Sequence, residues 1–542
     1  MPATFSYWPQ DRSEPLIEKT IGEVLQDAAR TWGPRIALVD GVADTASRRR
    51  WSFLALAETA EQVAGALLNR FSPGEHIAVW AANSPEWLML AFGAALAGLT
   101  LVPVNPAYLA DEMAYVLRQS RAAGLFVQDR YRGQDLPAMV AGTRDRLPDL
   151  RESVHFSAWA SFLQSGSAGL ALPGRSPHDI AQIQYTSGTT GFPKGAQLTH
   201  RGLANNGRLF ARAIGAREED VWINPMPLFH TAGCGLAALG ALQTGGCHIL
   251  LPGFDPALTL DLVASERGTL LLSVPTMLIR MLDEAARKPR DLASWRLAAL
   301  GGAPVALGLV RRAREELRLK VAIGYGQTEA SPYVTHTLPD DPNPDWARTV
   351  GRPLPQTEVK IVDPVTKEIL RLGEMGEICT RGYGVMKGYF GHDATTTAAL
   401  DEGGWLHTGD IGSMDGKGYC RVQGRLKDMI IRGGENIYPR EIEDVLLTHP
   451  SVANVSVIGL PDEEWGEIVA AFVQLRPGCV TKEQELAEFC RARLAAYKTP
   501  RLWRFVENFP QTGSGKIQKF ALRQQFLREH GQLPGAASSP VS

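Results

Sequence analysis

Residues 185–200 of the chain read YTSGTTGFPKGAQLTH. Most of the first half of this stretch is glycine, serine, threonine or tyrosine, and the second half adds one lysine, Lys194. A loop that combines hydroxyls, backbone N–H groups and a cation at this density is typical of a phosphate-binding site. We therefore predict that this loop holds phosphate oxygens.

The spacing of the loop is not that of a Walker P-loop, which needs Gly, any four residues and then Gly-Lys-Ser/Thr. After Gly188, Pro193 stands where the second glycine is required, and Gly195 stands where Ser or Thr is required. A flexible surface loop is the other alternative for a stretch rich in Gly, Ser and Thr. The flanks favour a binding loop, because largely apolar residues 180–183 lead into it and Pro193, Lys194 and Gly195 fix its exit.

Length and charge indicate a multi-domain protein that acts on small molecules. The chain has 542 residues, 44% of them hydrophobic, which is more than one ordinary core requires. A net charge of −2 argues against a general binder of nucleic acid or of anionic membranes. The six cysteines have no ligand-like spacing, so we expect reduced thiols and a cytoplasmic location rather than a zinc site or disulfides.

Two segments bear on membrane or export signals. Residues 1–15 carry acidic residues and prolines where a signal peptide would have a basic and an apolar region. Residues 87–104 form an uncharged run long enough to suggest a membrane span. Gly93, Gly98 and Pro103 divide that run, so we predict a buried helix over 86–97 and a short strand over 101–104 instead.

Apolar strand-like segments alternate with helical ones through the first part of the chain. The predicted strands are 76–80, 101–104, 124–128, 246–251 and 270–273, and the predicted helices are 86–97, 111–119, 257–266 and 276–286. This alternation is typical of βαβ units and parallel sheets, so the fold class is α/β. From residue 358, short glycine-rich segments predict a small β-subdomain.

A smaller α+β unit is predicted after residues 424–428 (GRLKD), with strands at 452–460 and 468–475 and helices at 439–449 and 482–495. Residues 531–542 have no apolar periodicity and are predicted to be a disordered tail.

Six further motifs follow the loop. They are PLFHTAG (227–233), LGGAP (300–304), GYGQTE (324–329), WLHTGD (405–410), the GRLKD segment with RGGENIYPREIE (432–443), and TGSGKIQK (512–519). Their types and order resemble the adenylate-forming superfamily, and in particular its acyl-CoA synthetases. The resemblance implies a large N-terminal domain (1–424), a hinge (425–428) and a small mobile C-terminal domain (429–530), with the active site between the two domains.

The resemblance also implies a nucleotide site. Tyr325 would stack on the adenine, Thr328 would contact the α-phosphate, and Glu329 would hold Mg²⁺, which prefers carboxylate oxygen. Asp410, assisted by Arg425, would bind the ribose hydroxyls. The full set of implied ATP contacts is Thr186, Ser187, Gly188, Thr189, Thr190, Gly191, Lys194, Gly302, Ala303, Pro304, Tyr325, Gly326, Gln327, Thr328, Asp410 and Arg425.

For the chemistry, the resemblance implies a carboxylate that attacks the α-phosphorus of Mg·ATP, and then a thioester formed with coenzyme A. The implied catalytic residues are Lys516, Thr328, Glu329 and His230, with His230 as a gate beside the reacting carboxylate. A general-base role for His230 is disfavoured, because a carboxylate is already ionised at neutral pH. Lys427 would be the hinge residue, and Gly433, Gly434 and Tyr438 would contact coenzyme A.

The expected acyl pocket consists of His230, Thr231, Gly233, Cys234, Gly235, Leu300 and Ser331. It contains no Lys or Arg to pair a second carboxylate, which disfavours dicarboxylic acids. Gly233 and Gly235 leave space, so we expect a medium-chain fatty acid or a cyclic or aromatic acid.

Three alternatives stay open from the sequence. One is an acyl-AMP ligase that loads a carrier protein, although the RGGENIYPREIE loop resembles that of ligases that use coenzyme A. A luciferase-like oxygenase and a non-catalytic nucleotide sensor are the others, and the presence of Thr328, Glu329 and Lys516 disfavours the sensor. A homodimer is a possible assembly.

Overall fold

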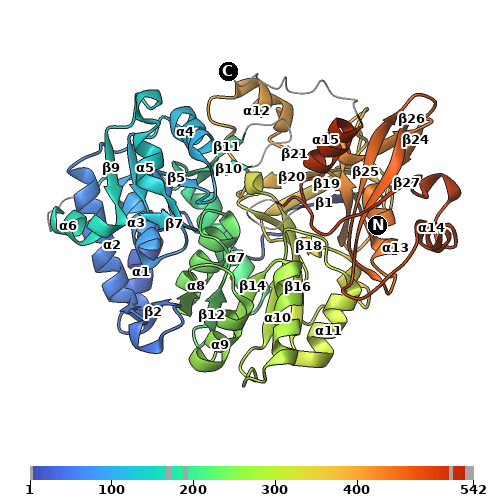
Figure 1. The fold of residues 1–542 in the computed structure, drawn as a ribbon. Coiled ribbons are helices and arrows are strands. Elements are labelled where there is room, and N and C mark those ends of the chain that lie inside the picture. Colours follow the sequence, from blue (N-terminus) through green and yellow to red (C-terminus); the bar gives the residue numbers. More distant parts are fainter. Residues whose placement is uncertain (1–3, 167–171, 187–192, 512–516, 531–542) are drawn as a thin grey trace, which may run out of the picture.

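The computed structural model describes residues 4–166, 172–186, 193–511 and 517–530. The predicted α/β fold is confirmed, with a large N-terminal part and a smaller C-terminal part (Figure 1). The predicted tail lies outside the described residues.

A nine-stranded sheet forms the centre of the N-terminal part, in the order β18-β17-β16-β15-β14-β12-β13-β2-β3. The strands from β16 to β2 are parallel, and the outer ones are antiparallel. Their bounds are β2 (Ile36–Asp40), β3 (Arg50–Ser52), β12 (Val221–Asn224), β13 (Cys247–Leu250), β14 (Leu270–Ser273), β15 (Leu297–Leu300), β16 (Lys320–Gly326), β17 (Tyr333–His336) and β18 (Arg352–Pro353). The helices α9 (Pro256–Glu266), α10 (Pro275–Arg287) and α11 (Leu307–Leu317) connect successive parallel strands, which is the βαβ pattern expected from the sequence.

A second, six-stranded sheet has the order β11-β10-β5-β4-β6-β9. Its strands are β4 (His76–Trp80), β5 (Thr100–Val104), β6 (Gly124–Val127), β9 (Glu152–His155), β10 (Ile180–Thr186) and β11 (Lys194–Thr199), joined in part by α3 (Pro85–Ala97) and α4 (Ala110–Gln119). The uncharged run at 87–104 is therefore a helix and a strand, as predicted. Gly98 ends the helix with a left-handed φ of +70°. In the described part of the chain, no helix is long and apolar enough to cross a membrane.

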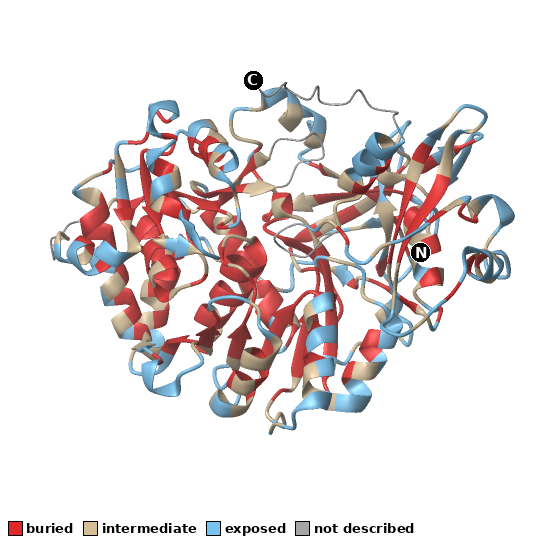
Figure 2. Cartoon of the chain, in the orientation of Figure 1, coloured by how far each residue is buried: buried red, intermediate tan, exposed pale blue. Residues whose placement is uncertain are grey.

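The largest hydrophobic core lies between the two sheets and the helices that cover them (Figure 2). The helices α1 (Ile21–Trp32), α2 (Phe53–Leu68), α3 and α7 (His200–Ala213) contribute buried residues to it. A π-helical segment, Ala232–Ala238, continues into α8 (Leu239–Thr244) and is buried along its length. The segment carries part of the predicted acyl pocket into this core.

The predicted β-subdomain is an antiparallel sheet, β1-β19-β20-β21-β22. It consists of β19 (Thr357–Val362), β20 (Gly376–Gly382), β21 (Leu406–Met414) and β22 (Cys420–Arg425), with the short helix α12 (Asp393–Ala399) before β21. The edge strand β1 (Tyr7–Trp8) comes from the start of the chain. The local sequence gave no sign of that long-range pairing.

The C-terminal part has its own sheet and its own core, at the right of Figure 1. The strands are β23 (Ile430–Arg432), β24 (Glu435–Ile437), β25 (Val452–Asp462), β26 (Gly466–Leu475) and β27 (Leu502–Phe505), and the helices are α13 (Pro439–Leu446), α14 (Glu483–Arg491) and α15 (Lys519–Glu529). The two hydrophobic clusters of this part contain only residues between Ile430 and Phe526.

Candidate active site

The predicted phosphate loop connects β10 and β11, which form an antiparallel hairpin. Thr186, at the end of β10, pairs with Lys194, at the start of β11. The Nζ atom of Lys194 lies 5.5 Å from the centre of the Tyr389 ring. The loop residues Ser187, Gly188, Thr189, Thr190 and Gly191 lie outside the described residues, so their phosphate contacts stay predictions.

Two of the predicted adenosine motifs lie side by side at the carboxyl edge of the nine-stranded sheet. The parallel neighbours β15 and β16 end there, with Leu300 paired to Ile323. Gly302, Ala303 and Pro304 follow β15, and the residues from Tyr325 to Thr328 close β16 and begin the next turn. The carboxyl edge of an open α/β sheet is where such folds bind ligands.

Tyr325 and Asp410 meet at this edge although they lie 85 residues apart. The hydroxyl of Tyr325 donates a 2.8 Å hydrogen bond to Oδ2 of Asp410. Burial and the charge of Asp410 raise the pKa of Tyr325, so the phenol remains a neutral donor. Arg425 is the cross-strand partner of Asp410, with Nε 3.5 Å from Oδ1. The structure thus brings the implied adenine and ribose residues together.

Glu329 lies in the turn Thr328–Ala330, directly after β16. It is buried, and its Oε1 accepts a 2.8 Å hydrogen bond from the hydroxyl of Tyr389. The backbone carbonyl of Glu329 accepts a second bond, from the N–H of Met386. One fixed carboxylate fits Mg²⁺, which usually takes one or two protein carboxylates beside phosphate and water.

Tyr389 was missed by the sequence analysis. It contacts Lys194 through its ring and Glu329 through its hydroxyl, so it joins two implied ATP contacts. No local pattern could reveal this, because neither partner is near it in the sequence.

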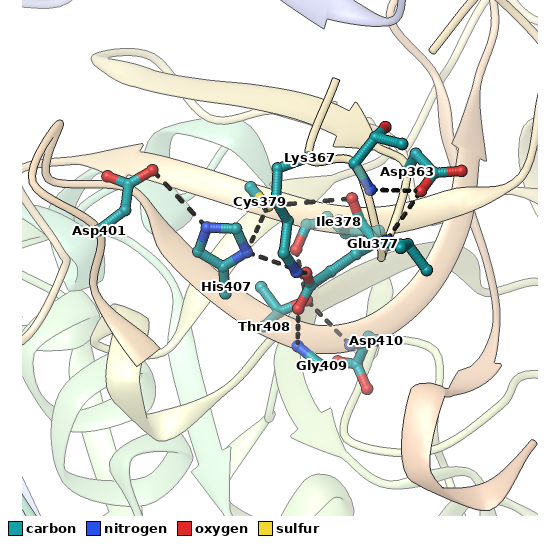
Figure 3. Close-up of polar contacts among 12 residues, drawn as sticks. Asp363, Lys367, Glu377, Ile378, Cys379, Asp401, His407, Thr408, Gly409 and Asp410 are labelled. Carbon is teal, nitrogen blue, oxygen red and sulfur yellow. Dashed lines mark hydrogen bonds and ion pairs between the residues drawn. The ribbon is translucent and has the colours of Figure 1, made fainter. Parts of the chain in front are cut away.

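A second group that the sequence motifs did not predict adjoins the Gly409–Asp410 turn and is drawn in Figure 3. Oε2 of the buried Glu377 accepts bonds from Nδ1 of His407 at 2.9 Å and from Nζ of Lys367 at 3.1 Å. Oε1 of Glu377 accepts a 3.2 Å bond from the N–H of Gly409, whose φ is +68°. This carboxylate therefore holds the left-handed residue that immediately precedes Asp410.

Cys379 also lies in this group, with Sγ 3.4 Å from Nδ1 of His407. Glu377, Cys379 and His407 together have the atom types of a metal site, and their ligand atoms lie within 4.8 Å of one another. However, the Lys367 ammonium already neutralises the carboxylate, and burial raises the pKa of Cys379 to about 12. The arrangement is therefore a hydrogen-bonded support for the Asp410 turn.

His230 lies just before the π-helical segment. Its Nδ1 accepts a 3.1 Å hydrogen bond from the backbone N–H of Ala232, which requires that Nδ1 carry no proton. In the neutral ring the proton is then on Nε2. The local turn therefore fixes the imidazole as an Nε2–H donor.

The two glycines of the predicted acyl pocket differ in what surrounds them. A Cβ on Gly233 would lie 2.7 Å from the carbonyl carbon of Pro227, so close backbone packing requires this glycine. A Cβ on Gly235 would have its nearest neighbour, Cδ2 of Leu203, at 3.6 Å. The expectation that both glycines leave space therefore needs correction: only Gly235 does.

Gly235 and Cys234 line an apolar cavity of about 30 Å³ between the π-helical segment, α1, α3 and α7. Two other predicted pocket members do not line this cavity: Thr231, just before the π-helical segment, is fully buried, and Ser331, after the turn Thr328–Ala330, donates a hydrogen bond to the Gly384 carbonyl. Leu300 does not reach the cavity. It belongs to a separate hydrophobic cluster, which also contains Ile223 and Val39, because side chains of a strand alternate between its two faces.

The predicted hinge residue Lys427 lies in a short 3₁₀ turn, Leu426–Asp428, that follows β22. Lys427 is partly exposed. Partial burial and the nearby positive charges of Arg425 and Lys194 nevertheless lower the pKa of Lys427. Lys427 therefore lies near Lys194 and Asp410.

Gly433 and Gly434 form the turn of the β23–β24 hairpin, with φ values of +58° and +86°. A tight hairpin of this kind needs two left-handed residues, which accounts for both glycines without a bound ligand. Tyr438 immediately precedes α13, and its side chain makes no capping hydrogen bond.

Lys516 lies outside the described residues, so its catalytic role stays a prediction. The neighbouring lysine, Lys519, has an assigned contact: its Nζ forms a 2.7 Å ion pair with Glu443 and donates to the Val457 carbonyl. This contact indicates a structural role for Lys519.

Comparison with known proteins gives concordant results. The AMP-binding enzyme model matches residues 25–390, and the AMP-binding enzyme C-terminal domain model matches residues 441–516. YngI of Bacillus subtilis (strain 168), named as a candidate acyl-CoA synthetase, is 38% identical over 544 residues, or 94% of this chain and 98% of that protein.

Two further similar proteins differ in the acid that their names state. The mitochondrial medium-chain acyl-CoA ligase ACSF2 of Homo sapiens is 35% identical over 547 residues, or 95% of this chain and 88% of that protein. The structure of the anthranilate CoA ligase AuaEII with anthranoyl-AMP matches with a TM-score of 0.86 and 27% identity, over 94% of this chain and 98% of that one. The chain therefore belongs to the AMP-binding enzyme family, in its acyl-CoA synthetase branch.

Proposed function

We propose that the protein joins a hydrophobic carboxylic acid to coenzyme A, in a reaction that consumes ATP, requires Mg²⁺ and releases AMP and pyrophosphate. The observation that carries this proposal is the convergence at one sheet edge of Tyr325, Asp410 and Glu329 with Lys194 of the phosphate loop. Family membership supports the same chemistry.

The described residues suggest how ATP would be held. Asp410 has two carboxylate oxygens, which suit a pair of ribose hydroxyls. The hydrogen bond from the Gly409 N–H to Glu377 holds the turn that precedes Asp410. Lys194 would pair with the phosphates that leave. Glu329 would hold Mg²⁺, which supplies charge neutralisation at the phosphates when bound.

In the first half-reaction, an oxygen of the acid carboxylate forms a bond to the α-phosphorus of ATP, and the bond to the β-phosphate oxygen breaks. Lys516 would stabilise the charge that builds at this phosphorus. The products are an acyl-adenylate and pyrophosphate. No covalent enzyme intermediate is needed.

In the second half-reaction, the thiol sulfur of coenzyme A bonds to the acyl carbon, AMP leaves, and the thiol proton is released. We propose that the C-terminal part rotates about Lys427 between the two steps. This rotation would move Lys516 out of the active site and bring the Gly433–Gly434 turn toward it. The exposed position of this turn supports its use as a mobile contact for the pantetheine arm.

The Nε2–H of His230 is suited to a gate beside the carboxylate, since it can donate a hydrogen bond without removing a proton.

The described cysteines support this non-covalent scheme. All six are free thiols, and burial raises the pKa of Cys234 to about 12, so the thiol stays neutral. Free thiols also support our proposal of a cytoplasmic location. The proposed homodimer would be tested by light scattering.

The direct test is AMP release over a panel of carboxylic acids, with coenzyme A, with a phosphopantetheinylated carrier protein, and with neither. We expect acid-dependent AMP release that accelerates with coenzyme A. Acceleration by the carrier alone would identify an acyl-AMP ligase. Failure of every acid to release AMP would overturn the proposal and favour a nucleotide sensor.

A further inference from the structure

Lys194 and Tyr389 are held in place by residues that belong to none of the sequence motifs. We infer, on the basis of the proposed function, that Gln119 is a positioning residue for these two side chains, and that Tyr115 assists it. Both positioning residues lie in α4, and each acts through the backbone segments that carry Lys194 and Tyr389 rather than through ATP itself.

The helix α4 contacts the β10–β11 hairpin through one of its faces (Figure 1). Tyr115 and Gln119 lie four residues apart in this helix, so their side chains leave the same face. The hydroxyl of Tyr115 donates a 3.2 Å hydrogen bond to the carbonyl of Pro193, which directly precedes Lys194. Buried residues of α4 and β10 also share one hydrophobic cluster. The helix is therefore a fixed support for the start of β11.

The side-chain amide of Gln119 joins two segments that are far apart in the sequence. Its Oε1 accepts a hydrogen bond from the hydroxyl of Tyr185, and its Nε2 donates one to the carbonyl of Phe390. Because a carbonyl only accepts, Nε2 must face Phe390, and Oε1 is then directed to Tyr185. Burial raises the pKa of Tyr185, so the phenol remains a neutral donor.

Tyr185 transmits the first of these contacts to the hairpin. Its cross-strand partner is Gly195, the residue after Lys194. A Cβ on Gly195 would lie 3.1 Å from Cζ of Tyr185, so the ring lies directly against the Gly195 backbone. A fixed Tyr185 ring therefore fixes the backbone next to Lys194.

Phe390 transmits the second contact to Tyr389, which directly precedes it. The N–H of Phe390 donates a 2.8 Å hydrogen bond to the carbonyl of Gly195 in β11. The Phe390 backbone is thus held through its N–H by β11 and through its carbonyl by Gln119. From this segment the ring of Tyr389 reaches Lys194. Gln119 therefore fixes the two segments relative to each other.

The two contacts explain why the residue in this position is glutamine. At neutral pH a side-chain amide both accepts and donates, a carboxylate only accepts, and leucine does neither. Gln119→Glu would therefore place a charge against the Phe390 carbonyl, and Gln119→Leu would remove both contacts. In either variant Lys194 and Tyr389 would be less well placed for the phosphates. The phosphates that leave are present only in the first half-reaction, so the defect should be confined to that step.

The test measures each half-reaction separately in the unmodified protein, in Gln119→Leu and in Gln119→Glu. The acid is one that releases AMP with the unmodified protein. KM for ATP in acid-dependent exchange of pyrophosphate should rise about three- to tenfold in both variants, because a neutral hydrogen bond contributes a factor of this size. Thioester formation from a supplied acyl-adenylate should keep its rate, because pyrophosphate has already left.

Two results would overturn the inference: an unchanged KM for ATP in the folded Gln119 variants, or equal losses in both half-reactions. Absence of acid-dependent exchange in the unmodified protein would instead count against the proposed function. Gln243→Leu is the matched control, since Gln243 is also half-buried and its Nε2 donates to the carbonyls of Ala204 and Leu239 at 2.9 and 3.0 Å. It should lower the melting temperature and leave KM for ATP unchanged, and a matching rise in KM would contradict a specific role for Gln119.

Tyr185→Phe and Tyr115→Phe keep the test valid if the Gln119 variants do not fold, because each removes one hydroxyl and keeps the ring. Each should raise KM for ATP and spare thioester formation. In the double variant Gln119→Leu with Tyr185→Phe, KM for ATP should rise no further than in Gln119→Leu alone, because the shared hydrogen bond is lost only once. Rises that multiply in the double variant would show that the two residues act independently and would overturn the inference.

Discussion

The hydroxyl of Tyr389 lies 2.8 Å from Oε1 of Glu329 and donates a hydrogen bond to it. This contact fixes the orientation of the Glu329 carboxylate. The same Tyr389 ring lies under the ammonium group of Lys194. One aromatic residue thereby contacts two side chains of opposite charge, both of which we propose to act on ATP.

Replacing Tyr389 with Phe should weaken Mg·ATP binding. Because a hydrogen bond to a charged group contributes about 1.5–3 kcal/mol, we expect kcat/KM for ATP to fall about 10- to 100-fold. The ring contact with Lys194 remains in this variant. Tyr419→Phe, which removes a hydroxyl bonded to Asp341, is the matched control. Unchanged kcat/KM for ATP in Tyr389→Phe would indicate that Glu329 does not bind the metal ion.

Glu377→Gln tests whether Glu377 supports the Gly409–Asp410 turn. The amide keeps the shape of the side chain but loses the charge that pairs with Lys367 and His407, so the Gly409 turn should loosen. We expect KM for ATP to rise about tenfold while KM for the acid stays the same. A variant that lowers kcat for every substrate without changing KM for ATP would contradict a positioning role.

The Glu377 carboxylate should also affect how the stability of the folded protein depends on pH. Burial alone would raise the pKa of Glu377, but hydrogen bonds from His407 and Lys367 bring it below the usual 4.5. A lowered folded pKa adds stability that is present above the unfolded pKa and is lost as the pH falls through the folded one. Thermal melts should therefore drop more steeply below about pH 4.5 for the unmodified protein than for Glu377→Gln.

Lys516→Ala should impair the first half-reaction. Loss of a group that stabilises developing charge lowers rates by about 100- to 1,000-fold, and acid-dependent exchange of pyrophosphate into ATP would measure the change. Lys519→Ala is the contrasting variant: its ion pair with Glu443 predicts a lower melting temperature, with exchange retained in the folded protein. Normal exchange in Lys516→Ala would remove this lysine from the mechanism.

Lys427→Pro should separate the two half-reactions. Proline fixes φ at the proposed hinge, so pyrophosphate exchange should continue while thioester formation from a supplied acyl-adenylate should stop. Stopped-flow or quenched assays of each half-reaction would show this. Equal loss of both activities would argue that Lys427 is not the hinge.

Much of the fold followed from local patterns. The uncharged run divided by glycine and proline predicted a buried helix over 86–97, and the alternation of strand-like and helical segments predicted the parallel strands around it. The pairing of β1 with β19 could not be predicted, since a two-residue edge strand has no periodicity and its partner lies more than 340 residues away.

The sequence by itself determined which chemistry-bearing segments exist, because each motif is contiguous and its residue types suit one task. Only the tertiary structure decided how they meet. It joined Tyr389 to Glu329 and Glu377 to the Gly409–Asp410 turn, and it turned Leu300 away from the apolar cavity that Gly235 lines. The physical reason is that the face a strand residue presents, and the partner a buried polar group finds, depend on packing between segments far apart in the chain.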